Sequence, residues 1–278
     1  FKGDEKEMST MCVLATHSPR ILHKDKVLPA FRALADGMKK AGEEIQAFKP
    51  DVMVVLTTHW FTTFNIYANA TPIQAGLYTA AEAPETINRI PYKLNGDPEL
   101  AEQIVADGLD AGLPCKVVND ESLIIDYGTL VPVDYFDPDN TLPVVSLSVC
   151  MNSSVDEYIQ FGRSLAKTFE NSGKRVVFVG SGSLAHYHSR NPEDWPPPEL
   201  RAMDEEVIQA LEKGDIEHLK KRLDPIAEAV RMEGYGYHVA SLVGVLEGLN
   251  HEEHKANMIV YGPSSGTGNA CMTFTPSN

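Results

Sequence analysis

Two short apolar runs that each end in a histidine constrain the fold of this chain more than any other feature. Residues 11–16 lead to His17, and residues 51–58 lead to His59. Aliphatic and β-branched residues follow one another in both runs with little polar alternation, which is typical of strands buried on both faces of a parallel sheet. Both histidines are therefore predicted to lie at the carboxyl ends of strands. In an open α/β sheet, the loops at that rim form the ligand crevice.

Helical and strand patterns alternate along most of the chain. This predicts a single α/β domain over residues 1–278, with a mostly parallel central sheet and helices on both faces. Helices are expected over residues 27–48, 98–111 (capped by Asp97), 155–171 (closed by Ser172 and Gly173) and 239–246. Further strands are expected over residues 142–149, 175–180 and 257–261. Residues 196–223 are expected to form a helical cover or oligomer surface near the crevice, and residues 262–269 a turn-rich segment.

Composition limits the classes of function. The 278 residues are 43% hydrophobic, which is enough for one large core. A formal net charge of −15 disfavours binding to nucleic acid or to an anionic membrane, because the excess of Lys and Arg that contacts phosphates is missing. No apolar stretch reaches the roughly 18 to 20 residues of a transmembrane helix. Residues 1–8 are charged, so no signal peptide is expected there, and they are predicted to be disordered or a non-native start.

The four cysteines also indicate the cellular compartment of the protein. Cys12, Cys115, Cys150 and Cys271 lack the spacing of a metal site, and three of them lie in strand-like apolar segments. Reduced thiols in the core are therefore expected. This state is typical of a cytoplasmic protein.

Two imidazoles on one rim are a candidate metal pair. A single histidine at a strand end is more often an ordinary hydrogen-bonded residue, but the matching placement of His17 and His59 favours a pair. A carboxylate would complete the 2-His-1-carboxylate set that binds non-heme Fe(II) and leaves positions open. Glu233 precedes the expected helix 239–246, where the helix dipole favours an acid. Glu228 is the alternative, because spacing does not separate the two, and either could be a solvent-facing or capping acid.

A second histidine cluster follows the expected strand 175–180. Small residues over 180–185 would let the backbone pass close to a ligand, and an imidazole with an ordinary pKa of about 6.5 suits proton transfer at neutral pH. His186 is the candidate base, whereas His188 is equally well explained as a hydrogen-bonded loop residue. The glycine-rich residues 266–269 lack the lysine and following helix of a phosphate-binding loop, so a structural turn is expected there.

Taken together, these motifs resemble those of a known enzyme family. The two histidine segments, residues 126–129, the loop ending at His186 and residues 266–270 occur in an order that resembles class III extradiol ring-cleaving dioxygenases, over nearly the whole chain. Catalytic subunits of protocatechuate and aminophenol dioxygenases are the most similar members. The resemblance implies Fe(II) held by His17, His59 and Glu233 with one face open. A catechol-like or 2-aminophenol-like substrate would chelate there beside O2, and both oxygen atoms would enter the ring as it opens beside the chelating pair.

The resemblance also implies roles for other residues. His186 would be the acid/base catalyst, and His188 and Tyr127 would form hydrogen bonds to substrate or oxygen. Asp126 either orients one of these groups or forms a turn. A homo-oligomer, or a hetero-oligomer with a related subunit, is expected.

Two other functions are compatible with these residues. One is a non-catalytic subunit or binding protein of the same fold, against which the presence of the histidines and a suitable glutamate argues. The other is a zinc hydrolase, because two histidines and a carboxylate with an open position also describe catalytic zinc. The absence of a His-Glu-x-x-His helix makes zinc hydrolysis the weaker interpretation.

Overall fold

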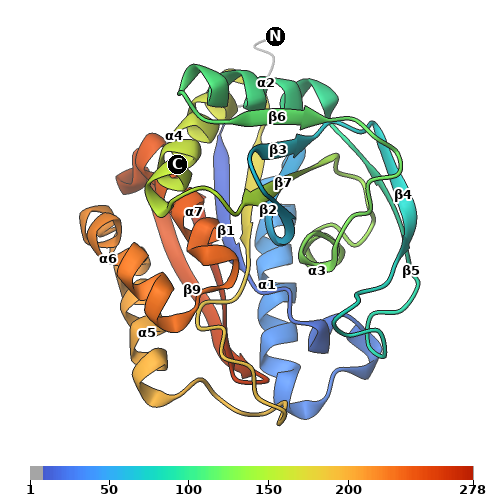
Figure 1. The fold of residues 1–278 in the computed structure, drawn as a ribbon, viewed down its shortest axis with the longest axis vertical. Coiled ribbons are helices and arrows are strands. Elements are labelled where there is room, and N and C mark those ends of the chain that lie inside the picture. The colour runs from blue at the N-terminus through green and yellow to red at the C-terminus, as the bar shows by residue number, and fades with distance from the viewer. Residues whose placement is uncertain (1–8, 278) are drawn as a thin grey trace.

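The computed structural model describes residues 9–277, and the prediction for residues 1–8 lies outside this range. Its strands are β1 (Thr10–Ala15), β2 (Val52–Thr62), β3 (Ile66–Asn69), β4 (Ile73–Tyr78), β5 (Ile90–Asn95), β6 (Cys115–Val118), β7 (Val144–Cys150), β8 (Val176–Ser181), β9 (His254–Ser264) and β10 (Thr267–Pro276). Eight of them form one sheet in the order β6-β3-β7-β2-β8-β1-β10-β9, and β4 and β5 form a separate ribbon (Figure 1). Its strands come from the whole length of the described chain, from β1 to β10.

The centre of the sheet is parallel, as predicted. Strands β7, β2, β8 and β1 pair in parallel with one another, and every residue of β1, β7 and β8 is buried. Strands covered on both faces need continuous aliphatic sequence, which explains why these segments show no polar alternation. The β9–β10 hairpin extends one side of the sheet in antiparallel pairing with β1.

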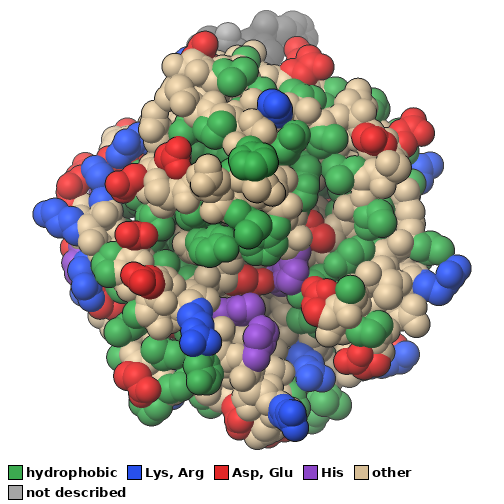
Figure 2. All heavy atoms as spheres, viewed as in Figure 1, with side chains coloured by type: hydrophobic (Ala, Val, Ile, Leu, Met, Phe, Trp, Pro, Cys, Tyr) green, Lys and Arg blue, Asp and Glu red, His purple; other side chains and the backbone are tan. Residues whose placement is uncertain are grey.

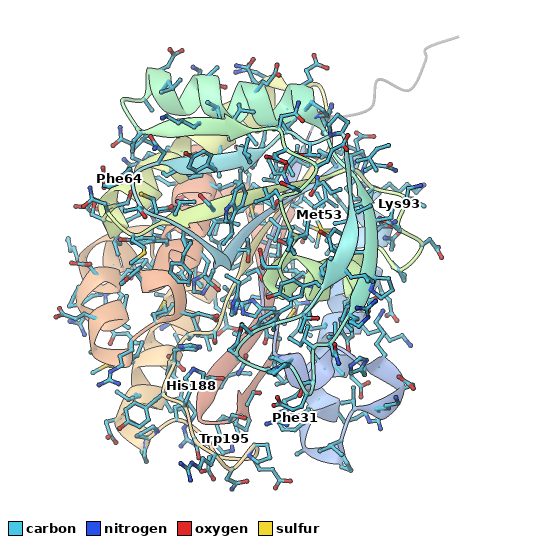
Figure 3. All side chains as sticks on the ribbon, turned by 45° about the vertical axis from the view of Figure 1, so that its right-hand side comes forward. Phe31, Met53, Phe64, Lys93, His188 and Trp195 are labelled. Carbon is cyan, nitrogen blue, oxygen red and sulfur yellow. The ribbon has the colours of Figure 1, made fainter. Side chains whose placement is uncertain are left out.

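Helices cover both faces of the sheet. They are α1 (Arg32–Phe48), α2 (Pro98–Asp110), α3 (Tyr127–Phe136), α4 (Val155–Asn171), α5 (Pro198–Lys213), α6 (Ile216–Val230) and α7 (Tyr237–Gly248). Because successive strand residues point to opposite faces, Met11 and Val13 of β1 pack with α1 and α3, whereas Cys12 and Leu14 pack with α4 and α7. Met53 of β2 belongs to the α1 side of this core (Figure 3).

One predicted helical boundary was wrong. Helix α1 begins at Arg32 rather than residue 27, because Leu28 precedes a proline and is extended, and a short 3-10 turn (Pro29–Phe31) follows it. The region 196–223, predicted as a helical cover, contains two helices. Gly214 ends α5 with a positive φ of 64°, and Asp215 caps α6, which continues to Val230.

The turn predicted over residues 262–269 was wrong for most of its length. Strands β9 and β10 pair through this segment, so that Gly268 lies opposite Pro263, and only Ser265 and Gly266 form the turn. Glycine occurs within β10 because a Cβ at Gly268 would lie 2.0 Å from the Asp204 carboxylate. The glycines of this segment therefore allow close packing as well as the turn between β9 and β10.

Two further features concern the helices and the cysteines. None of the helices within residues 9–277 has the length and apolar character needed to cross a membrane. The four cysteines are buried and unpaired, as predicted for reduced core thiols.

Candidate metal centre

The two histidines predicted at strand ends face each other at the carboxyl rim of the sheet. His17 follows β1, and His59 lies near the end of β2, where the pairing with β7 shifts register between Leu56 and Phe61. The centroids of the two imidazole rings are 4.8 Å apart. Strands β1 and β2, which lie on either side of β8 in the parallel sheet, therefore bring together two side chains 42 positions apart in sequence.

The short 3-10 turn Glu233–Gly236, between α6 and α7, carries Glu233 to the same point. Gly234 is required for this approach, because its φ is 55° and a Cβ there would lie 2.6 Å from the methyl group of Thr58. Thr58 immediately precedes His59, so the turn packs directly against the end of β2. The sequence of the turn thus fixes the distance between the carboxylate and the second histidine.

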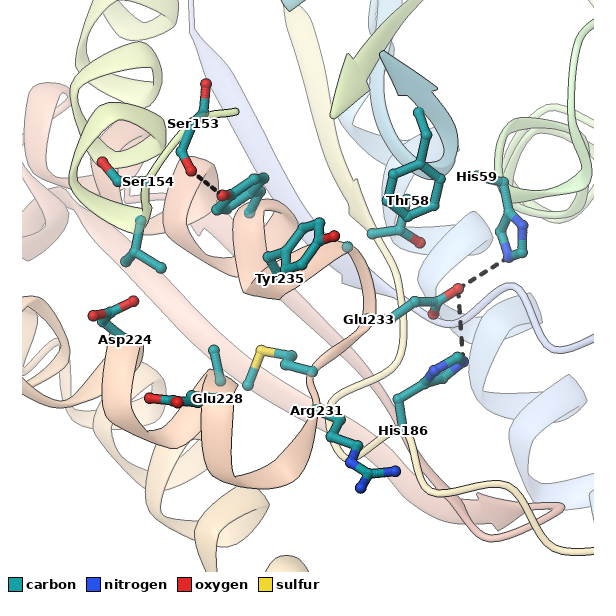
Figure 4. Close-up of a pocket in the computed structure, with 16 residues that line it drawn as sticks. Thr58, His59, Ser153, Ser154, His186, Asp224, Glu228, Arg231, Glu233 and Tyr235 are labelled. Carbon is teal, nitrogen blue, oxygen red and sulfur yellow. Dashed lines mark hydrogen bonds and ion pairs between the residues drawn. The ribbon is translucent and has the colours of Figure 1, made fainter. Parts of the chain in front are cut away.

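Three donor atoms converge in this arrangement. Glu233 Oε1 lies 3.0 Å from His17 Nε2. It also lies 2.9 Å from His59 Nε2 (Figure 4). Two ligand atoms held about 2.1 Å from one ion at a right angle are about 3 Å apart, so these spacings suit a shared metal ion. Within residues 9–277, His17, His59 and Glu233 form a group whose ligand atoms all lie within 4.8 Å of one another.

The hydrogen bonds around His17 fit a cation. Ser181 has one hydroxyl proton and donates it to the Gly128 carbonyl, so its Oγ accepts from His17 Nδ1 at 2.9 Å. His17 Nε2 then faces the Glu233 oxygen, at 3.0 Å. His59 Nε2 is also buried, and within residues 9–277 it has no well-aligned hydrogen bond, although it lies 2.9 Å from Glu233 Oε1. A cation between these atoms would satisfy both nitrogens and the carboxylate.

Glu233 is held as an anion. Its Oε2 accepts hydrogen bonds from the backbone N–H and the hydroxyl of Ser183, at 2.7 and 2.6 Å. Burial raises the pKa of the Glu233 carboxyl, but His17 and His59 outweigh burial and hold this pKa well below its usual range. The other oxygen, Oε1, therefore faces the histidines and carries negative charge.

His186 lies beside the three donors. Its Nε2 is 4.0 Å from Glu233 Oε1, and its ring packs edge-on against His188 with centroids 4.3 Å apart. Burial is the main reason that the pKa of His186 lies below its ordinary value, and the nearby charge of Glu233 offsets only part of this effect. The imidazole is thus neutral near pH 7 and able to accept a proton.

Tyr127 forms another wall of the site. Its ring centroid lies 4.0 Å from that of His59 and 5.3 Å from that of His17. Asp126, predicted either to orient a site residue or to form a turn, is the N-cap of α3. Its Oδ1 accepts from the Thr129 N–H at 3.2 Å and from the Thr57 hydroxyl at 2.6 Å. The cap thereby ties the start of α3, and Tyr127 with it, to β2.

The site opens into two adjoining cavities. One, of about 590 Å³, is lined by all three donors together with Tyr127, His186 and His188, and the other, of about 630 Å³, is lined by His59, His186 and Glu233 but not by His17. Figure 2 shows histidine and acidic side chains gathered in a hollow on this face. The candidate donor group of His17, His59 and Glu233 therefore opens as a whole into the first cavity.

Glu228 is separate from the donor group. It is exposed on α6 and lines the second cavity with Asp224, across from His59 (Figure 4). Sequence reasoning missed Ser181, Ser183 and Glu82, whose Oε1 lies 3.5 Å from His59 Nδ1. The small-residue loop 180–185 was a usable signal for the serines, whereas Glu82 occurs in an irregular segment with no pattern.

A comparison with protein families gives a match along nearly the whole chain. The model described as the catalytic LigB subunit of aromatic ring-opening dioxygenase matches residues 11–272. This range includes His17, His59, His186 and Glu233.

Characterised relatives are similar at low identity. A 3,4-dihydroxyphenylacetate 2,3-dioxygenase of Escherichia coli is 28% identical over 76% of this chain and 79% of its own length. The beta subunit of a 2-aminophenol 1,6-dioxygenase of Pseudomonas sp is 25% identical over 94% of this chain and 92% of its own. The alpha subunit of a Pseudomonas 2-aminophenol 1,6-dioxygenase is 26% identical over 86% of this chain and 89% of its own.

A solved structure has the same fold. The crystal structure of an uncharacterized protein from Escherichia coli K12 superposes with a TM-score of 0.68 and covers 95% of this chain and 98% of its own. The two sequences are 19% identical, so this likeness concerns the fold alone.

Proposed function

Because the chain belongs to the LigB family of aromatic ring-opening dioxygenases and is an extradiol dioxygenase, we propose that it uses Fe(II) to open a catechol-like or 2-aminophenol-like ring. Both atoms of O2 would enter the product, and the ring would open beside the two chelating heteroatoms. The observation that carries this proposal is the convergence of His17, His59 and Glu233 on one point that opens into a cavity. Two histidines and one carboxylate are the donor set of non-heme Fe(II) oxygenases.

His17, His59 and Glu233 would hold the metal. Bound Fe(II) would supply open positions at which ring and O2 lie side by side, and a route for electron density between them. Ser181 and Ser183 would keep the His17 nitrogen and the Glu233 oxygen directed at the ion.

The remaining residues would move and hold protons. His186 would take the proton of a chelating substrate hydroxyl at its unprotonated ring nitrogen and return a proton later. The pKa of the Tyr127 hydroxyl is raised, first by burial and then by nearby carboxylates, so Tyr127 would stay protonated and donate a hydrogen bond to substrate or oxygen. His188 lines the same cavity and would hydrogen-bond farther out.

A zinc hydrolase has less support. The donor set alone suits catalytic zinc. The relatives named above are dioxygenases, however, and the site places a neutral histidine and a phenol around an open cavity rather than a helix-borne zinc motif. These facts favour oxygen chemistry on an aromatic ring.

Anaerobic purification followed by reconstitution tests the proposal. Protein loaded with Fe(II) or with Zn(II) is mixed with a panel of catechols and 2-aminophenols, and oxygen uptake and the absorbance of the yellow ring-fission product are recorded. We expect about one O2 consumed per ring with Fe(II) and none with Zn(II). Equal activity with zinc, or hydrolysis without oxygen uptake, would contradict it.

We also propose that the chain works in the cytoplasm as an oligomer, either with itself or with a related subunit. The cysteines are buried and unpaired, which suits a reducing compartment. The support for assembly is that two relatives carry names of alpha and beta subunits. Light scattering on the purified protein would give its mass, and a single 30.5 kDa species would contradict self-association.

A further inference from the structure

An irregular segment, residues 79–89, forms one wall of the cavity into which the donor group opens. It joins β4 to β5, and its buried Ala80 donates a backbone hydrogen bond to the carbonyl of the buried Ile87 at 3.1 Å. The ring of His23 also bonds the Thr86 carbonyl at 3.0 Å. The wall is therefore fixed at both ends, and its side chains have defined places in the cavity.

Glu82 extends from this wall to the donor group. Its Oε1 lies 3.5 Å from Nδ1 of His59, the ring nitrogen on the side away from Glu233. Burial is the main cause of the raised pKa of the Tyr127 hydroxyl, and the negative charges of Glu233 and Glu82 raise this pKa further. Glu82 therefore also influences Tyr127, which forms another wall of the site. Its side chain is 52% exposed, which leaves it open to a molecule in the cavity. A ring held beside Tyr127 would have this charge as a neighbour.

Apart from Glu233, both cavities are lined by more Asp and Glu than Lys and Arg side chains. Apart from Glu233, the cavity beside Glu82 is lined by the carboxylates of Glu82 and Glu85 and by one guanidinium, Arg20. The second cavity is lined by Asp224 and Glu228 and by one guanidinium, Arg231. Each therefore has two carboxylates against one guanidinium.

We infer that Glu82 is a specificity residue that disfavours rings with an anionic substituent, so the substrates of this enzyme carry neutral or cationic substituents. This inference rests on the proposed function, since it concerns the ring bound at the same site. A carboxylate substituent would meet Glu82 and the net negative lining, whereas an ammonium group would be attracted to them.

The test uses three catechols with the same two-carbon side chain at position 4, ending in a hydroxyl, an ammonium or a carboxylate group. Their dissociation constants are measured by anaerobic calorimetry on Fe(II)-loaded protein. We expect the ammonium compound to bind about three- to fivefold tighter than the alcohol, and the carboxylate compound weaker by a similar factor. In Glu82→Gln both ratios should move toward one, and in Glu82→Lys they should reverse.

Glu102→Gln is the matched control, because it removes one negative charge from the exposed side of α2 and leaves both cavities unchanged. Its ratios should equal those of the wild type. If Glu82 only orients His59, its substitution would weaken all three ligands alike and leave the ratios unchanged, which would overturn the inference. Tightest binding of the carboxylate compound would also overturn it. Oxygen uptake is recorded separately, so ligand ratios judge the inference while ring opening judges the proposed function.

Discussion

Ser183 donates both its backbone N–H and its hydroxyl to the same oxygen of Glu233, Oε2, at 2.7 and 2.6 Å. The carboxylate is thereby oriented with its other oxygen toward His17 and His59. A single residue in the loop after β8 thus determines which oxygen of a residue 50 positions later faces the donor group. Such supporting hydrogen bonds contribute to metal affinity because they hold a ligand in its bound orientation before the ion arrives.

Ser183→Ala removes the hydroxyl and keeps the backbone donor. We expect the affinity for Fe(II) to fall about tenfold, measured anaerobically by competition with a chromogenic chelator. Ser146→Ala is the control, since Ser146 is also a buried serine but its hydroxyl has no hydrogen-bond partner among residues 9–277. Unchanged affinity in Ser183→Ala would show that the backbone N–H alone orients the carboxylate.

His17→Ala and His59→Ala should separate from His186→Ala in iron content. The first two variants lose a donor and should emerge from anaerobic gel filtration without stoichiometric iron, whereas His186→Ala should retain it. Turnover of His186→Ala should nevertheless fall about 10²- to 10⁴-fold, because the proton acceptor is gone. Iron loss of the same size in all three variants would mean that His186 is a ligand rather than the base.

Glu233→Ala and Glu228→Ala decide the third ligand in the same assay. Glu233 is buried against both histidines, while Glu228 is exposed on α6. We expect iron to be lost from the Glu233 variant and retained in the Glu228 variant. Retention in both would place the carboxylate ligand elsewhere.

Gly234→Ala tests the close approach of the Glu233 turn to β2. The substitution forces a side chain into a positive φ, at a cost of about 1 to 2 kcal/mol, and adds a clash with Thr58. Gly112→Ala is the control, because its φ is 80° and, its chain neighbours aside, no atom of the described residues lies within 4 Å of the added Cβ. By urea denaturation, Gly234→Ala should lose more unfolding free energy than Gly112→Ala, and only Gly234→Ala should also lose iron. Equal losses would mean that the contact with Thr58 is unimportant.

The central strands and their histidines were predictable because burial on both faces leaves an unambiguous pattern. The start of α2 was also predictable, since Asp97 accepts from the Leu100 N–H at 3.1 Å ahead of Pro98. Helix α3 was not, because almost all of its residues are buried and Pro132 lies within it, so no amphipathic period marks it.

The site was predictable only where local sequence fixes position. His17 and His59 follow from strand ends, whereas Glu233 and Glu228 could not be separated by spacing. The difference comes from the left-handed turn at Gly234, which moves Glu233 against β2 and leaves Glu228 on a helix surface. Glu82 was beyond prediction, because its contact with His59 depends on how the β4–β5 ribbon packs.

Asp204 gives a pH-dependent prediction about the loop that carries His186. This carboxylate of α5 is fully buried, and it accepts from the Ala185 N–H at 2.8 Å and from the Tyr261 hydroxyl at 2.7 Å. Burial outweighs these hydrogen bonds and raises the pKa of Asp204 to about 7.

Because the folded pKa of Asp204 lies above its unfolded value, this group stabilises the fold most at low pH. That contribution should decline between about pH 4 and 7, by about 4 kcal/mol at most. Asp204→Asn removes the ionisation and keeps an acceptor for the Ala185 N–H. Urea denaturation at pH 5 and pH 8, in the same metal buffer, should therefore show a larger loss of unfolding free energy in the wild type than in Asp204→Asn. Asp204→Leu, which leaves the buried Ala185 N–H without an acceptor, should be less stable than Asp204→Asn at both pH values. Parallel pH dependence in wild type and Asp204→Asn would show that Asp204 remains ionised in the folded protein throughout this range.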